Sequence, residues 1–154
     1  MEWWDVGGSL FAYSQLVERL WKEQESFLIV EHDVELSLRA LRQARHCPCE
    51  WGVSPYRGPW DGVGTPPLLD KSLGCTRFSA SLMKSLPDAV VEANRIDDAG
   101  TVVPPGSWQR LDCRLYSILR GVGENMHTPH IHDEVLHHHK FGYGCSCGGK
   151  CEES

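Results

Sequence analysis

The chain has 154 residues, with 21 acidic and 15 basic side chains, a formal net charge of -6 and 41% hydrophobic residues. This composition excludes general disorder, and no apolar run approaches the roughly 20 residues that cross a bilayer. The acidic balance also argues against binding to a phosphate backbone, so we expect neither direct nucleic-acid binding nor a membrane partner.

The cellular setting follows from the N-terminus and the cysteines. The first residues contain no basic segment followed by an apolar stretch, so no secretory signal is expected. Seven cysteines are an odd number, unlike the even disulfide frameworks of small secreted domains. These features predict a cytoplasmic, reducing location.

Periodicity in the first third of the chain predicts two helices around a strand. Apolar residues at helical spacing over 9–24 indicate an amphipathic helix capped by Ser9. The continuous apolar run 27–30 is typical of a central, parallel strand that is buried on both faces. A second helix is predicted over 37–45.

The rest of the chain alternates turn-rich segments with short elements. Residues 46–72 contain five prolines and predict a long surface loop. We expect a strand at 73–78, a helix over 79–93 interrupted near Pro87, a helix over 108–120 capped by Ser107, and a strand within 125–131. Residues 1–141 are expected to form one domain, and 142–154 a flexible Gly/Cys-rich tail.

Two carboxylates follow the predicted central strand. Alternation along an extended segment directs Glu31 and Asp33 to one side and His32 to the other. Two carboxylates on one side suit a hard divalent cation, and ligands bind beyond the carboxyl ends of strands in open α/β sheets. A solvated turn without a ligand is the alternative.

A third carboxylate lies on the packed side of the late helix. Asp112 falls at the edge of the apolar arc of that helix, whereas Arg110, Arg114 and Ser117 are expected on the opposite face. A carboxylate on a packed face is costly unless it is paired, metal-bound or open to a cavity. Asp112 is therefore a candidate general base with a raised pKa, and an ion pair with an arginine is the alternative.

Histidines are concentrated near the C-terminus, where six of the eight fall between positions 127 and 139. Imidazole binds transition metals, and a mixture of carboxylates and imidazoles suits manganese. His137 and His139 are candidate metal ligands, although a surface run without a ligand remains an alternative.

These motifs together resemble a known family. The sequence is similar to small glycosyltransferase-like proteins of GT-A type, in the nucleotide-diphospho-sugar transferase superfamily, some of them phage-encoded. The resemblance covers residues 11–141. It rests on Tyr13 with Leu20-Trp21, Phe27-Leu28-Ile29-Val30-Glu31-His32-Asp33, Cys47-Pro48-Cys49-Glu50-Trp51, Pro55-Tyr56, Leu73-Gly74-Cys75-Thr76-Arg77-Phe78-Ser79, Trp108 with Leu111-Asp112, and His127 and Pro129 with His137.

The resemblance implies an α/β fold, a reduced GT-A-like (Rossmann-like), mostly parallel sheet flanked by helices. It implies metal-dependent transfer of a hexose from a nucleotide-sugar donor to an unknown acceptor. Glu31 and Asp33 would hold Mn2+ or Mg2+ on the donor diphosphate, His137 or His139 would complete the coordination, and Asp112 would activate the acceptor hydroxyl.

The start of the chain departs from the family pattern. GT-A enzymes begin with a strand and loop that bind the nucleotide base, whereas here the first predicted helix follows Met1-Glu2-Trp3-Trp4-Asp5 almost directly. An N-terminally reduced member is expected, for which a protein partner could complete the donor site.

Three alternatives stay open. One is an inactive, truncated transferase relative. Another is a non-catalytic metal-binding or interaction protein, which rests on Cys47 and Cys49 after His46 and on Cys145, Cys147 and Cys151 of a Cys/His-rich tail that could hold Zn2+. The third is a metal-dependent nuclease, suggested by His130-Ile131-His132-Asp133, although the acidic chain lacks a basic stripe with interleaved aromatic residues. The aromatic residues Trp51, Tyr56, Trp60 and Trp108 either stack on a sugar or base or pack in the core.

Overall fold

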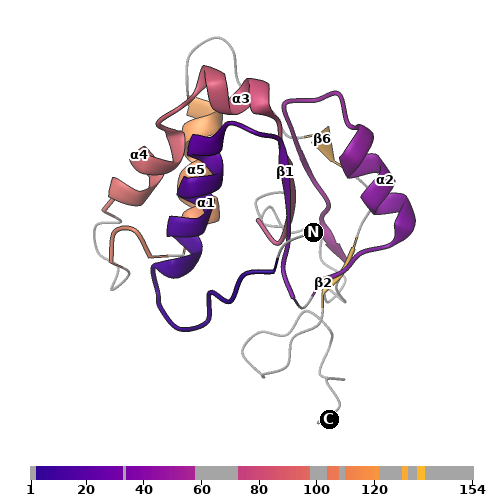
Figure 1. The fold of residues 1–154 in the computed structure, drawn as a ribbon, viewed down its shortest axis with the longest axis horizontal. Helices are drawn as coiled ribbons and strands as arrows, with labels where there is room; N and C mark the ends of the chain where they lie inside the picture. The colour runs from indigo at the N-terminus through magenta and orange to yellow at the C-terminus, as the bar shows by residue number, and fades with distance from the viewer. Residues whose placement is uncertain are drawn as a thin grey trace, which may run out of the picture. The chain divides into compact units, whose positions relative to one another are not determined.

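A computed structural model describes residues 3–32, 34–57, 73–97, 104–107, 110–121, 130–131 and 135–137. The chain divides into two compact units, and each unit combines segments from both halves of the sequence. The first contains described residues within 1–27 and 79–128, and the second those within 28–78 and 129–154. Figure 1 shows the helices and strands of both.

The first unit is helical. It contains α1 (Ala12–Glu23), α3 (Ala80–Ser85), α4 (Ala89–Arg95) and α5 (Leu111–Gly121). Helix α4 packs against both α1 and α5. Trp21 of α1 is buried, and its indole nitrogen donates a hydrogen bond to the Leu86 carbonyl at 2.8 Å, which joins α1 to the end of α3.

The helix boundaries partly match the sequence predictions. The interruption near Pro87 is confirmed, since α3 and α4 are separate helices and the Ser79 hydroxyl caps α3. Helix α1 begins at Ala12, and Ser9 instead accepts a hydrogen bond from the Phe11 amide, just before the helix. Helix α5 begins at Leu111, three residues later than predicted.

The second unit contains two small sheets and one helix. One sheet has four strands in the order β1 (Phe27–Val30), β5 (Cys75–Phe78), β3 (Trp51–Val53) and β6 (His130–Ile131). The other has three, in the order β2 (Val34–Glu35), β7 (Val135–His137) and β4 (Tyr56–Arg57). Helix α2 (Leu38–His46) follows β2 and is capped by the Ser37 hydroxyl.

The prediction of a mostly parallel, GT-A-like sheet flanked by helices is wrong. The two inner strands, β3 and β5, are antiparallel, and parallel pairing in the described residues is limited to the short pairs β3–β6 and β4–β7. No Rossmann-like parallel sheet forms in the part of the chain that the structure describes. Parallel neighbours would run in the same direction, whereas β3 and β5 pair in opposite directions, with Trp51 opposite Phe78 and Val53 opposite Thr76.

The apolar run 27–30 was also misplaced by the sequence prediction. Strand β1 lies at one end of its described sheet, its first three residues are only half-buried, and Val30 is 38% exposed. An inner position belongs instead to β3, which lies in the proline-rich segment predicted as an irregular loop. Trp51 and Val53 are fully buried there, and the Trp51 ring stacks on Phe78 with centroids 6.0 Å apart.

Helix α2 buries its alanines and exposes its first leucine. Leu38 is 73% exposed, and the buried residues of the helix are Ala40 and Ala44. Ala40 belongs to a core cluster with Cys75 of β5, against which Val34 and Leu36 pack. Part of the predicted loop, 58–72, and the whole tail, 142–154, lie outside the described residues, so the predicted tail boundary stays a prediction.

Candidate functional site

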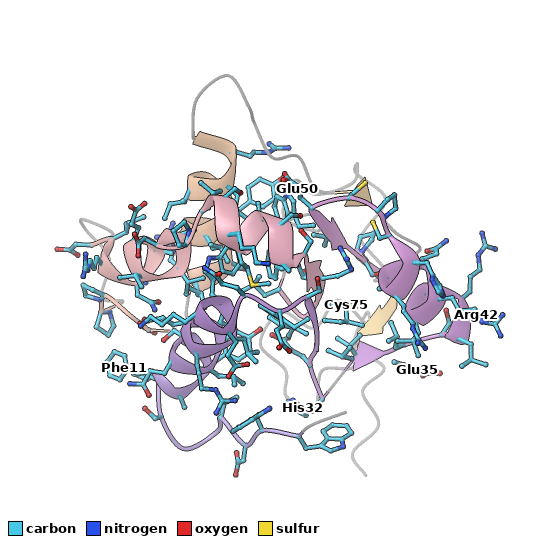
Figure 2. All side chains as sticks on the ribbon, turned by 45° about the horizontal axis from the view of Figure 1, so that its top comes forward. Phe11, His32, Glu35, Arg42, Glu50 and Cys75 are labelled. Atoms are coloured by element: carbon cyan, nitrogen blue, oxygen red, sulfur yellow. The ribbon has the colours of Figure 1, made fainter. Side chains whose placement is uncertain are left out.

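The turn after β1 holds the first candidate carboxylate. The Glu31 amide donates a hydrogen bond to the Gly74 carbonyl at 2.8 Å, and the Val34 amide donates one to the Glu31 carbonyl at 3.1 Å. These bonds fix the backbone at both sides of a tight turn between β1 and β2. Glu31 is half-buried and His32 is exposed, and Figure 2 shows His32 at the end of this turn.

A histidine-bearing strand pairs with the residues that follow this turn. Strand β7 runs antiparallel to β2, with Val34 opposite His137 and Glu35 opposite Leu136. The backbone of His137 therefore lies beside a residue only three positions after Glu31. Residues separated by a hundred positions in the sequence meet here in one unit.

The Asp112 carboxylate lies in the first turn of α5 and is half-buried. Its Oδ1 accepts a hydrogen bond from the Cys113 amide at 2.7 Å. Loss of hydration raises the pKa of Asp112 above 3.8, and the Cys113 hydrogen bonds and the Arg110 charge oppose that rise only in part. A raised pKa brings a carboxyl closer to the range in which it exchanges protons as a general base.

The neighbours of Asp112 correct one detail of the sequence prediction. Arg110 and Ser117 are exposed as expected, but Arg114 is only 2% exposed. Its position explains this burial, because Arg114 is three residues after the buried Leu111 on the helix and therefore shares its face.

The predicted site residues fall into three groups. Glu31 and the backbone of His137 lie in the second unit, whereas Asp112 lies in the first. Asp33 and His139 lie outside the described residues. The structure therefore brings together the strand end and the histidine strand, and the convergence of Asp112 with them stays a prediction.

The donor chemistry fits a hard or borderline divalent cation. Glu31 and Asp33 supply carboxylate oxygens and the histidines supply imidazole nitrogens, a combination suited to Mn2+. Within the described ranges, no three His, Cys, Asp or Glu side chains are grouped closely enough to hold a metal ion. Asp33 and His139 would thus have to complete the set, and the tail cysteines proposed for Zn2+ lie outside the described residues.

Of the aromatic residues considered for stacking on a sugar or base, the structure describes the ring of Trp51. Trp51 is 2% exposed and stacked on Phe78, so it packs in the core and does not offer a surface for a sugar. Trp60 and Trp108 lie outside the described residues. Sequence alone could not distinguish these roles, because both require a large apolar ring.

Comparisons with protein-family models, with curated proteins and with solved structures find no match for this chain. The family resemblance noted in the sequence therefore remains a hypothesis that rests on its motifs. Among the residues that the structure describes, no helix is both long enough and apolar enough to cross a membrane.

Proposed function

We propose that the chain is a metal-dependent glycosyltransferase that moves a hexose from a nucleotide-sugar donor to an acceptor hydroxyl. The observation that carries this proposal is the register of β2 with β7, in which His137 is opposite Val34. It gives the acidic turn and the histidine-rich segment a common location, as a mixed carboxylate and imidazole site requires.

The proposed roles follow from the chemistry of the side chains. Glu31, Asp33 and His137 or His139 would hold the divalent cation. When bound, the cation would neutralise negative charge that develops on the leaving diphosphate. The hydrogen bonds of the Glu31 backbone to the Gly74 carbonyl and from the Val34 amide would help to position Glu31 before the donor arrives.

Asp112 is the proposed acceptor base. A carboxylate that is partly removed from water is a stronger proton acceptor than an exposed one, and burial raises the pKa of Asp112. Proton removal by Asp112 would strengthen the acceptor hydroxyl as a nucleophile toward the anomeric carbon. Its amide contact with Cys113 would orient the carboxylate.

Donor hydrolysis tests the proposal without knowledge of the acceptor. The purified chain is incubated with a panel of UDP- and GDP-sugars and Mn2+, and release of UDP or GDP is measured. We expect release with at least one donor, dependent on Mn2+ and lost in Glu31→Gln, while Glu25→Gln, which changes an exposed carboxylate before β1, retains it. Release that is insensitive to both Mn2+ and Glu31→Gln would contradict the proposal.

Once an acceptor is identified among simple sugars or glycosides, Asp112→Asn tests whether Asp112 acts as the general base or only stabilises the fold. The substitution keeps the side-chain size and the oxygen that accepts from Cys113, so the fold should persist by circular dichroism while sugar transfer falls by about 100-fold or more, as for loss of a general base. Full transfer by the folded variant would remove Asp112 from this role.

A further inference from the structure

Helix α2 carries a basic stripe in an otherwise acidic chain. The stripe consists of Arg39, Arg42 and Arg45, and residues 36–49 contain no acidic side chain. All three arginines are exposed. Figure 2 shows the Arg42 side chain directed outward from the helix. Positive charge is therefore concentrated on one short element of the second unit.

Helical geometry places the three arginines on one face of α2. At about 100° per residue, they fall within an arc of about 120°. Leu38 and His46, which are also exposed, belong to the same arc. The buried residues of the helix, Ala40 and Ala44, are centred on the opposite side. The helix thus packs through its alanines and presents its basic stripe to solvent.

The stability of α2 does not account for all of this charge. Positive side chains in the last turn interact favourably with the carbonyl end of a helix, which explains Arg45 and His46. Arg42 lies in the middle of the helix, where this effect has faded. Within the described ranges, Arg42 has no ion-pair partner. Its charge is therefore available to an anion outside the chain.

The net charge of -6 does not prevent a local contact with an anion. Salt screens charges beyond a Debye length of about 8 Å at physiological ionic strength, so an approaching anion responds mainly to the nearest side chains. The closest acidic residues in the sequence, Glu35 and Glu50, precede and follow the helix. Total composition does not reveal this segregation, and for that reason it predicted no binding to a phosphate backbone.

The form of the exposed face decides which anion fits it. An anionic bilayer requires an apolar side that enters the interface, and this face offers only Leu38. An acidic peptide requires pockets for its anchor side chains, whereas this face is the convex surface of a helix. Single-stranded nucleic acid stacks on exposed aromatic rings, and Trp51 and Phe78 of the four-stranded sheet are buried.

A nucleic-acid duplex has none of these requirements. Its phosphates carry one charge per about 1.7 Å of helix axis, and release of their counterions supplies affinity without a pocket. The stripe extends over six residues from Arg39 to Arg45, which is about 9 Å of helix. It can therefore face several phosphates at once.

We propose that α2 is a docking surface for the phosphate backbone of duplex DNA, bound without sequence preference. Arg39, Arg42 and Arg45 each donate to a phosphate oxygen, in the charge-assisted geometry that guanidinium groups favour. Leu38 contributes nothing essential to this contact. The surface does not depend on the proposed transferase activity.

The test is the fluorescence anisotropy of a labelled DNA duplex during titration with the full chain. Duplexes of about 20 base pairs are used at salt concentrations from about 25 to 200 mM. Three phosphate contacts predict a slope of about -3 for the logarithm of the association constant against the logarithm of salt concentration, and a Kd of about 10⁻⁴ M or tighter at the lowest salt. A slope near zero, or no binding at the lowest salt, would overturn the proposal.

Variants of the exposed arginines locate the contact. Arg42→Gln and Arg45→Gln should each weaken binding by about 10-fold at low salt and make the slope less steep by about 1. Arg42→Lys retains the charge and should bind as the native chain does. Arg95→Gln is the matched control, because it removes an exposed arginine from the last turn of α4 in the first unit. Circular dichroism verifies that each variant is folded.

Competing ligands and Leu38→Gln distinguish DNA from the other partners. Leu38→Gln should leave DNA binding unchanged. Duplexes of different sequence should bind equally well, and better than the single strand, polyglutamate or phosphatidylserine vesicles at the same salt concentration. Tighter binding to any of these three ligands, or equal losses in Arg42→Gln and Arg95→Gln, would overturn the proposal.

Discussion

At the scale of single residues, Asp112 shows what a sequence can and cannot reveal. Helical spacing predicted that this carboxylate lies at the edge of a packed face, and the structure finds it half-buried beside the buried Leu111. The same helical spacing predicted Arg114 on the outer face, and that prediction was wrong, because Arg114 follows Leu111 by three residues and shares its buried face.

Asp112 should make the stability of the protein depend on pH. Its pKa is raised in the folded state, so the folded state retains this proton at pH values where the unfolded state has lost it. The contribution of Asp112 to the stability of the folded protein is therefore greatest below the ordinary pKa value of 3.8, and it is lost as the pH rises through the raised pKa of the folded state. Asp112→Asn removes the ionisation, so the variant should gain stability relative to the native chain over this interval.

The measurement is the free energy of unfolding by urea for both proteins between about pH 3 and 7. The difference should grow in favour of Asp112→Asn as the pH rises and then level off. Glu25→Gln serves as the control for an exposed carboxylate and should show no comparable growth. A difference that is independent of pH would show that Asp112 is well hydrated when folded, and a difference that shifts in favour of the native chain as the pH rises would show that it is strongly paired.

At the scale of elements, local signals located most helices but could not order the strands. Serine caps marked the starts of α2 and α3, and Pro87 marked the break before α4. The run 27–30 was predicted as a central strand because it is apolar, yet β1 is only half-buried. Which strand lies inside a sheet depends on pairing between distant segments, and local apolarity does not encode that pairing.

The end of α1 offers a prediction at this scale. Gln24 closes the helix in the left-handed conformation, with φ 54° and ψ 30°, and its amide donates to the Trp21 carbonyl. A side chain with a β-carbon is disfavoured there, whereas glycine is not. Gln24→Gly should therefore stabilise the protein by about 1 kcal/mol in urea unfolding.

A matched substitution in the same helix gives the opposite sign. Gln15 is exposed in the first half of α1, so Gln15→Gly should destabilise the protein by about 1 kcal/mol through lost helix propensity. Destabilisation by both substitutions would mean that residue 24 does not adopt the left-handed conformation in solution.

At the scale of the whole molecule, two compact units interleave along the sequence. Glu31 and the backbone of His137 belong to one unit and Asp112 to the other. Motif spacing could suggest that residues 31 and 137 cooperate, and the β2–β7 register supports that expectation. Motif spacing could not show how the chain divides into two units, because the segments of each unit are distant in the sequence and come together through tertiary packing.

The net charge bears on the proposed donor. At a formal charge of -6, the chain as a whole repels a nucleotide diphosphate. A divalent cation at the acidic turn would cancel the two negative charges of Glu31 and Asp33 there. UDP should therefore bind weakly to the metal-free chain and at least 10-fold more tightly with Mn2+, as measured by isothermal titration calorimetry, and equal affinity in both conditions would remove the cation from donor binding.

The claim that the turn between β1 and β2 is a metal site can be tested directly by electron paramagnetic resonance of free Mn2+ during titration with protein. The native chain and Glu25→Gln should deplete the free-ion signal equally, whereas Glu31→Gln, Asp33→Asn and one of the two variants His137→Ala and His139→Ala should each bind Mn2+ at least 10-fold more weakly. Undiminished Mn2+ binding by all four variants would contradict the account.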